Sequence, residues 1–237
     1  MIIDIDDPKS VQAAMEGIAR DWFDPAGLYA GLKVGGKTDS SGFWAIPTRM
    51  LADVSEFLGW TSEKFLGEWD KRCFENDTKF MGYHCTRHSD MGVFLEKGIL
   101  PLSGETVKLT NNEGQKTEER GVLQYRLRQT PGPWFLLGYR CAKKPDNHFR
   151  LKGPEILLGC DGYHVGVEPA KSIPLIIHCA IPYSLLSETG YFAFCALRAY
   201  FSFLDPEDGS DDFFDGYSID LQGKTLDPGH IVKVEET

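Results

Sequence analysis

The sequence lacks the features of secreted, membrane-spanning and zinc-binding proteins. No apolar run approaches the roughly 20 residues that a helix needs to cross a bilayer. The acidic start, MIIDIDDPKS, differs from the basic-then-apolar order of a signal peptide. The six cysteines form no C-x-x-C pair, so neither a zinc site nor a disulfide scaffold is predicted. We therefore expect reduced thiols and a cytoplasmic protein, with no membrane association and no metal site.

Positive charge is also scarce. The 25 Lys and Arg residues are outnumbered by 35 Asp and Glu residues, which leaves a net charge of −10. Because proteins bind nucleic acid tightly by neutralising its phosphates, general nucleic-acid binding is not expected. The basic stretch from Arg120 to Arg128, extended by Arg140, Lys143 and Lys144, is interpreted as a solvated helix face.

Two common catalytic motifs are missing as well. The sequence has no G-x-G-x-x-G after an expected strand and no G-x-S-x-G elbow, which argues against Rossmann-type and serine-hydrolase functions. A cysteine hydrolase would pair Cys85 with His84, His88 or His178. Adjacent strand residues point to opposite faces of a sheet, so His84 is poorly placed to serve Cys85.

The chain does have the composition of a folded protein, with a large share of aromatic residues. Hydrophobic residues make up 42% and charged residues 25% of its 237 residues, so a buried core is feasible. Aromatic residues make up 12%, and some of their flat apolar faces could line a cleft for a nucleobase or nicotinamide. The alternation of helical and extended patterns predicts an α+β fold.

Apolar residues recur at helical spacing in the first third of the chain, so we interpret residues 1–78 as a helical N-terminal extension. Potential capping residues and glycine stops divide this third into segments. Three helices are predicted, from Ser10 to Trp22, from Thr48 to Gly59 and from Thr61 to Phe74, with a loop from Gly27 to Gly42.

The pattern changes at Lys79, and residues 79–237 are predicted to form a second domain. Helices are expected from Ser89 to Gly98, from Glu118 to Gln129 and from Tyr183 to Phe203. Strands are expected at Phe80–Thr86, Trp134–Tyr139, Ile156–Leu158, Leu175–Ile181, Tyr217–Leu221 and Ile231–Val234.

The segment with most chemical information opens this second domain. Gly82–Tyr83–His84–Cys85–Thr86–Arg87 places H-x-T-R at a strand end, before a short helix and the sequence G-I-L at Gly98 to Leu100. This order resembles the opening of the diphtheria-toxin-like ADP-ribosyltransferases, a group that includes the poly(ADP-ribose) polymerases and the RNA 2′-phosphotransferases. The resemblance implies a split antiparallel β-sheet core with NAD as the substrate.

The same resemblance implies roles for four residues of the strand. His84 would hydrogen-bond the nicotinamide ribose, and the backbone around Tyr83 would hold the nicotinamide amide. Thr86 would add a hydroxyl at the entrance of the same NAD site, and Arg87 could neutralise the pyrophosphate of NAD. The alternative is that His84 is a hydrogen-bonded histidine with a purely structural role at a strand end.

A second segment, from Tyr217 to Val234, is similar to the closing hairpin of that family. Laid on the family pattern, the catalytic glutamate position falls on Gln222. A carboxylate stabilises a sugar cation, whereas an amide can only hydrogen-bond, so Gln222 argues against polymer elongation. Glu155, just before an expected strand, is the predicted substitute acid. Phe149 is the predicted ring under the nicotinamide and Tyr139 its alternative, although either ring could simply belong to the core.

These observations predict an NAD-dependent mono-ADP-ribosyltransferase or NAD glycohydrolase. The acceptor could be a protein or a small molecule, and the sequence does not identify it. The alternative is a catalytically weak or inactive module of the same fold that binds NAD, ADP-ribose or a protein.

Overall fold

The computed structural model describes residues 1–35, 46–103, 107–109, 132–145, 163–165, 172–205 and 217–237. Within these ranges the protein is a mixed α+β molecule with an open, mainly antiparallel six-stranded sheet. The α+β prediction is therefore confirmed. Five of the predictions lie outside the described residues: the helix from Glu118 to Gln129, the solvated face from Arg120 to Arg128, the strand Ile156–Leu158, and the site residues Phe149 and Glu155.

The chain forms two compact units, each made of two separate segments. The helical unit contains residues 1–81 and 182–215, and the sheet unit contains residues 82–181 and 216–237. The chain first passes from the helical unit to the sheet unit between Met81 and Gly82, close to the domain boundary expected between residues 78 and 79. The inclusion of residues 182–215 in the helical unit did not follow from the sequence pattern.

Most of the helical unit is α-helix. Its elements are β1 (Ile2–Ile3), α1 (Pro8–Ala19), α2 (Pro25–Val34), α3 (Pro47–Phe57), α4 (Ser62–Glu75), the 3-10 turn η4 (Tyr183–Leu185) and α9 (Thr189–Leu204).

Local capping decides where the first helices begin. The Asp7 side chain accepts a hydrogen bond from the Lys9 amide, so α1 begins at Pro8 and not at Ser10. The Ser10 hydroxyl instead donates to the Ile2 carbonyl, 2.8 Å away. The cap expected at Thr61 is confirmed by its bond to the Lys64 amide.

The predicted loop from Gly27 to Gly42 is wrong over its first part, because Pro25–Val34 is the helix α2. Asp24 caps this helix and Pro25 occupies its first turn, a start signal that the glycines obscured. Three apolar residues of α2 are buried, and this burial outweighs the low helix propensity of Gly27 and Gly31. They are Leu28, Tyr29 and Leu32.

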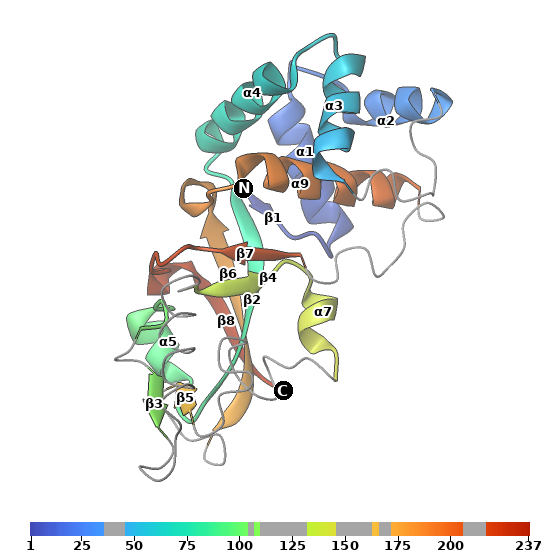
Figure 1. Ribbon diagram of the computed structural model, residues 1–237. Helices are drawn as coiled ribbons and strands as arrows, with labels where there is room; N and C mark the ends of the chain where they lie inside the picture. The colour runs from blue at the N-terminus through green and yellow to red at the C-terminus, as the bar shows by residue number, and fades with distance from the viewer. Residues whose placement is uncertain (36–45, 104–106, 110–131, 146–162, 166–171, 206–216) are drawn as a thin grey trace. The chain divides into compact units, whose positions relative to one another are not determined.

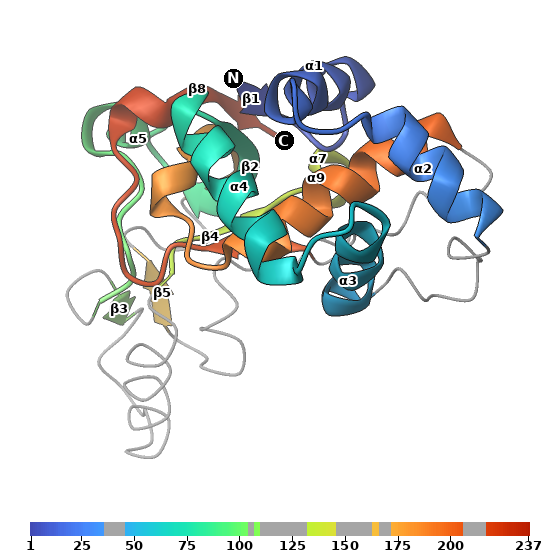
Figure 2. The ribbon, with the colours of Figure 1, turned by 90° about the horizontal axis from the view of Figure 1, so that it is seen from above.

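Helix α9 is the centre of the helical unit and contacts α1, α2, α3 and α4 (Figure 1 and Figure 2). All residues from Phe192 to Phe201 are buried, as expected for a helix that is covered on every side. The helix expected from Tyr183 begins later, at Thr189, since Tyr183–Leu185 forms η4. The Asp70 carboxylate of α4 accepts bonds from the Tyr183 hydroxyl (2.6 Å) and the Thr189 hydroxyl (3.2 Å).

The sheet unit is built around strand β2 (Lys79–His88), whose first residues belong to the helical unit and pair there in parallel with β1. Its other elements are α5 (Gly92–Lys97), β3 (Val107–Leu109), β4 (Trp134–Leu136), α7 (Tyr139–Lys143), β5 (Tyr163–Val165), β6 (Ile173–Pro182), β7 (Ser218–Asp220), the 3-10 turn η5 (Pro228–His230) and β8 (Ile231–Glu236).

The strand order is β7-β4-β2-β6-β8, which leaves β7 and β8 at the edges of this path. Tyr83 of β2 lies opposite Leu136 of β4, and Leu136 lies opposite Ser218 of β7. On the other side, His178 of β6 pairs with Lys233 of β8. The strand expected at Trp134–Tyr139 stops at Leu136, and the residues after it turn into the short helix α7.

Candidate functional site

Strand β2 presents its polar residues on two opposite faces of the sheet. Side chains alternate along a strand, so Tyr83, Cys85 and Arg87 share one face and His84 and Thr86 share the other. This alternation separates the residues that the sequence grouped into a single site.

On the first of these faces, Tyr83 lies in a cluster of rings. Its ring centre is 5.2 Å from that of Tyr139 at the start of α7, and 5.2 Å from that of His178 on β6. The Tyr139 and His178 rings are 5.1 Å apart. Two of the predicted cofactor-binding residues, Tyr83 and Tyr139, are thus brought together, although they are more than 50 residues apart in the sequence.

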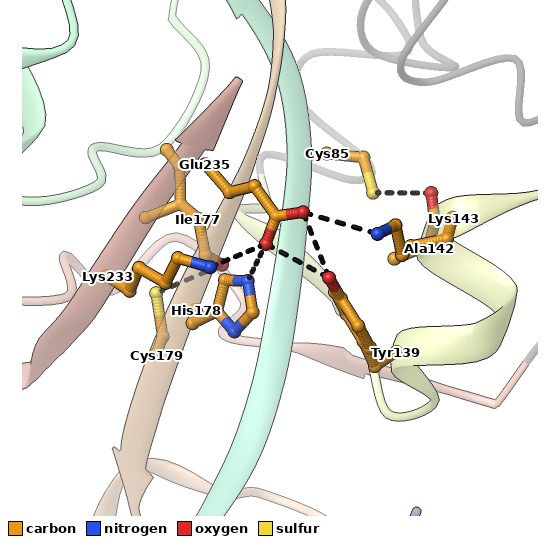
Figure 3. A network of polar contacts seen from close by, with 9 residues as sticks. All are labelled: Cys85, Tyr139, Ala142, Lys143, Ile177, His178, Cys179, Lys233 and Glu235. Atoms are coloured by element: carbon orange, nitrogen blue, oxygen red, sulfur yellow. Dashed lines mark hydrogen bonds and ion pairs between the residues drawn. The ribbon is translucent and has the colours of Figure 1, made fainter. Parts of the chain in front are cut away.

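A single carboxylate joins this ring cluster to the edge strand β8, as Figure 3 shows. Glu235 accepts hydrogen bonds from the Tyr139 hydroxyl at 2.9 Å, from His178 Nε2 at 3.1 Å and from Lys233 Nζ at 2.9 Å. Lys143 Nζ of α7 lies 3.4 Å from its Oε1 atom. We call these five residues, Tyr139, Lys143, His178, Lys233 and Glu235, the Glu235 cluster.

The surroundings of Glu235 favour its charged form. The hydrogen bond from Lys233 is the largest of several interactions that lower the pKa of the Glu235 carboxyl to about 2, with Tyr139 and His178 also contributing. Burial acts in the opposite direction but does not prevail. The side chain is 16% exposed, so an ionised carboxylate remains within reach of a ligand.

The register of the strands explains how the cluster forms. His178 and Lys233 are paired, and Glu235 follows Lys233 by two residues, so all three side chains lie on one face. Tyr139 reaches the same face because the chain turns into α7 directly after β4. The sequence offered only a weak signal for this, the K-x-E alternation of Lys233 and Glu235, because the strand expected at Ile231–Val234 stopped one residue before Glu235.

On the opposite face, His84 is held against strand β4. Its Nδ1 atom lies 2.8 Å from the carbonyl oxygen of Trp134, and its ring centre is 5.5 Å from that of Phe135. Loss of solvation lowers the pKa of His84, and the bond to Trp134 opposes this only in part. The imidazole is therefore neutral at physiological pH, and Nδ1 is the nitrogen that donates its proton.

The remaining predicted residues take separate positions. Gln222 is exposed in the turn after β7, with a positive φ of 51°, and strand β4 lies between β7 and the strand of His84. Thr86 is buried, at 7% exposure. Arg87 donates to the hydroxyl (3.2 Å) and the carbonyl (2.8 Å) of Ser172, just before β6.

Cys85 shares the face of the Glu235 cluster but bonds elsewhere. Its Sγ atom lies 4.0 Å from the carbonyl oxygen of Ala142 in α7, and the side chain is buried. Figure 3 shows the sulfur directed toward α7. The cysteine-hydrolase alternative therefore stays a prediction that an alkylation experiment would test.

The helical unit also holds a phosphate-binding pattern that the sequence analysis did not single out. Residues 31–38 read GLKVGGKT and match the P-loop pattern G-x-x-x-x-G-K-T. A P-loop follows a strand and precedes a helix, whereas Gly31 to Val34 are the last turn of helix α2. Residues 36–38 lie outside the described ranges. The described part of this segment thus has the wrong structural context for a phosphate cradle.

No family model, curated protein or solved structure matches this chain. In the part of the chain that the structure describes, no helix is long and apolar enough to cross a membrane. The same residues contain no group of three or more His, Cys, Asp and Glu that could hold a metal ion.

Proposed function

We propose that the sheet unit binds NAD and cleaves its nicotinamide–ribose bond. The protein would act as a mono-ADP-ribosyltransferase or an NAD glycohydrolase on a fold of the split antiparallel type. The C–N bond would break with its electron pair on nicotinamide, and an acceptor or water would form the new bond to the ribose carbon. With water, the products would be ADP-ribose, nicotinamide and a proton.

The observation that carries this proposal is the Glu235 carboxylate, which accepts a hydrogen bond from Tyr139, whose ring packs against that of Tyr83. Cleavage builds positive charge on the sugar, and a nearby carboxylate stabilises that charge. The sequence pattern placed an amide, Gln222, where the resembling family has its acid. Glu235 would supply the carboxylate, and the partly exposed ring of Tyr139, which packs on the buried ring of Tyr83, would suit the nicotinamide ring.

The proposal assigns the ligand to only one of the two faces of β2, and so to only some of the predicted site residues. His84 and Tyr83 point to opposite faces, so the side chains of both cannot contact one nicotinamide ring. With Glu235 as the catalytic carboxylate, the ligand would lie on the sheet face to which Tyr83 points. The bond of His84 to Trp134 would then be structural. His84, Thr86 and Gln222 remain the site that the resemblance implies, and substitutions on the two faces distinguish these sites.

The test is nicotinamide release from NAD, measured by chromatography, for the wild type and five variants. Glu235→Gln should lower turnover by 100-fold or more, because removing one preorganised charge contact costs about 3 kcal/mol or more of transition-state stabilisation. Glu236→Gln is the matched control, since Glu236 is exposed on the same strand and points to the other face. His84→Ala and Gln222→Glu should leave turnover within about threefold.

Two results would contradict this assignment. An active Glu235→Gln variant that is as fast as the wild type would exclude Glu235 as the acid. A gain of turnover in Gln222→Glu, together with a loss in His84→Ala, would place the reaction on the other face instead. Tyr139→Phe keeps the ring but removes the hydroxyl that contacts both Glu235 oxygens, so its intermediate activity would separate a catalytic role of the carboxylate from misfolding.

The second candidate is a binding module that does not turn over NAD. It is favoured by the saturation of Glu235, whose two oxygens interact with Tyr139, His178, Lys143 and Lys233. Such a carboxylate can serve simply to fix α7 to β8. Calorimetric binding of NAD or ADP-ribose by a protein that releases no nicotinamide would establish this candidate.

The proposed partners are NAD and an acceptor that is a protein or a small molecule, and general nucleic-acid binding is not expected at a net charge of −10. We place the protein in the cytoplasm, where thiols remain reduced. Among the described residues, five cysteines are present and none of them forms a disulfide.

A further inference from the structure

Two lysines converge on Glu235 from different elements. Lys143 of α7 approaches Oε1 at 3.4 Å, and Lys233 of β8 approaches Oε2 at 2.9 Å. Their side chains are 50% and 57% exposed. The two ammonium groups therefore approach different oxygens of one carboxylate (Figure 3), on side chains that are at least half exposed.

The balance of charge at this point is opposite to that of the whole chain. Two ammonium groups face one carboxylate, so the site keeps an excess of positive charge within a protein of net charge −10. Ion pairs between exposed lysines and a carboxylate are weak, because water screens them and the long side chains lose freedom. A phosphate group carries more charge and more acceptor oxygens, so it competes well for the same lysines.

An aromatic ring adjoins one of the two lysines. Lys143 Nζ lies 5.2 Å from the ring centre of Tyr139, which in turn is 5.2 Å from that of Tyr83. Tyr139 is partly exposed beside Lys143, and Lys233 lies on the same carboxylate, an arrangement that fits a ligand joining an aromatic ring to phosphate. An extended nucleic acid would need cations along its whole backbone, which the acidic composition disfavours. A free nucleotide matches these features better.

We propose that Lys143 and Lys233 exchange Glu235 for the phosphates of a free nucleotide. The exchange neutralises the phosphates and at the same time leaves Glu235 without its two lysine partners. This inference rests on the proposed function only for the choice of an adenine nucleotide as the probe. It adds the two residues that select a phosphate-bearing ligand over the corresponding nucleoside.

The test uses titration calorimetry of the full chain with ADP and with adenosine. Wild-type protein should bind ADP at least tenfold more tightly than adenosine, and more weakly as the salt concentration rises. Lys143→Gln and Lys233→Gln should each weaken ADP binding about tenfold, the usual effect of losing one charge-assisted hydrogen bond. Adenosine binding should not change. Lys97→Gln, on the exposed side of α5, is the control and should behave as the wild type.

Arginine at either position keeps the charge, so Lys143→Arg and Lys233→Arg should retain ADP binding if the charge is what matters. The inference is overturned if wild-type protein binds neither ligand, if the double Gln variant binds ADP as the wild type does, or if ADP and adenosine lose affinity equally. If the protein binds ADP through these lysines but releases no nicotinamide, this inference stands and the proposed function is wrong. If the double Gln variant releases nicotinamide with the wild-type KM for NAD, the proposed function stands and this inference is overturned.

Discussion

At the scale of single residues, Glu235 should make stability depend on pH in a defined range. Its pKa falls from 4.5 to about 2 on folding, so its contribution is fully present above about pH 4.5. That contribution is lost as the pH falls toward 2, because the folded state must then take up a proton. After allowance for solvent screening, we expect about 1–2 kcal/mol.

Urea unfolding at pH 7 and near pH 3 measures this effect. The wild type should lose more stability between the two pH values than Glu235→Gln, which carries no titrating group there. Glu236→Gln should follow the wild type. Equal losses in all three proteins would show that Glu235 does not bond its partners as the structure has it.

His84 gives a second prediction at this scale. If its main role is the bond from Nδ1 to the Trp134 carbonyl, His84→Ala should cost about 1 kcal/mol of stability. His84→Asn should cost less, since an amide nitrogen can donate from a similar position. Thermal unfolding measures both. A drop in NAD affinity with unchanged stability would instead support the ribose-binding role that the resemblance implies.

At the scale of elements, the connection after α5 depends on one glycine. Gly98 has a φ of 73°, and a Cβ atom there would lie 2.1 Å from the carbonyl oxygen of Leu226. The approach is this close because Ile99 and Leu226 exchange two backbone hydrogen bonds of 2.9 Å. A side chain at Gly98 would therefore be strained and would also push these segments apart.

Gly98→Ala should destabilise the protein by about 2–4 kcal/mol, because both strain and a backbone clash are introduced. Gly67→Ala is the matched control within helix α4, where a Cβ atom would meet nothing within 4 Å. That change should stabilise by about 0.5–1 kcal/mol through helix propensity. Denaturant midpoints compare the two, and a harmless Gly98→Ala would contradict the described path of residues 98–99.

At the scale of the whole molecule, the helical unit consists of two segments that are far apart in the sequence, and α9 supplies its centre. Phe201 of α9 is 1% exposed and lies 5.2 Å from the ring of Tyr29 on α2. Phe201→Ala should cost about 3–5 kcal/mol, the usual result of truncating a buried aromatic residue.

Hydrogen exchange followed by mass spectrometry shows whether the unit responds as one body. In Phe201→Ala, peptides from α1 to α4 should lose protection together with those of α9, because a compact unit opens cooperatively. Loss of protection confined to α9 would argue that the N-terminal helices form a body of their own.

The sequence by itself determined the α+β class and the positions of most elements, because apolar periodicity and capping residues act locally. The Thr61 cap of α4 and the strands β2 and β6 are examples. The sequence-based prediction was wrong at α2, because glycines typical of a loop follow Asp24 and Pro25, the residues that begin this helix.

Only the tertiary structure decided which residues meet. Strand register set Glu235 beside His178, and the turn after β4 brought Tyr139 to the same carboxylate. The alternation of side chains along β2 divided His84 from Tyr83, which are neighbours in the sequence. The location of α9 within the helical unit likewise depends on packing between distant segments. Long-range pairing of this kind leaves no periodic trace in the sequence, so the Glu235 cluster could not be predicted from it.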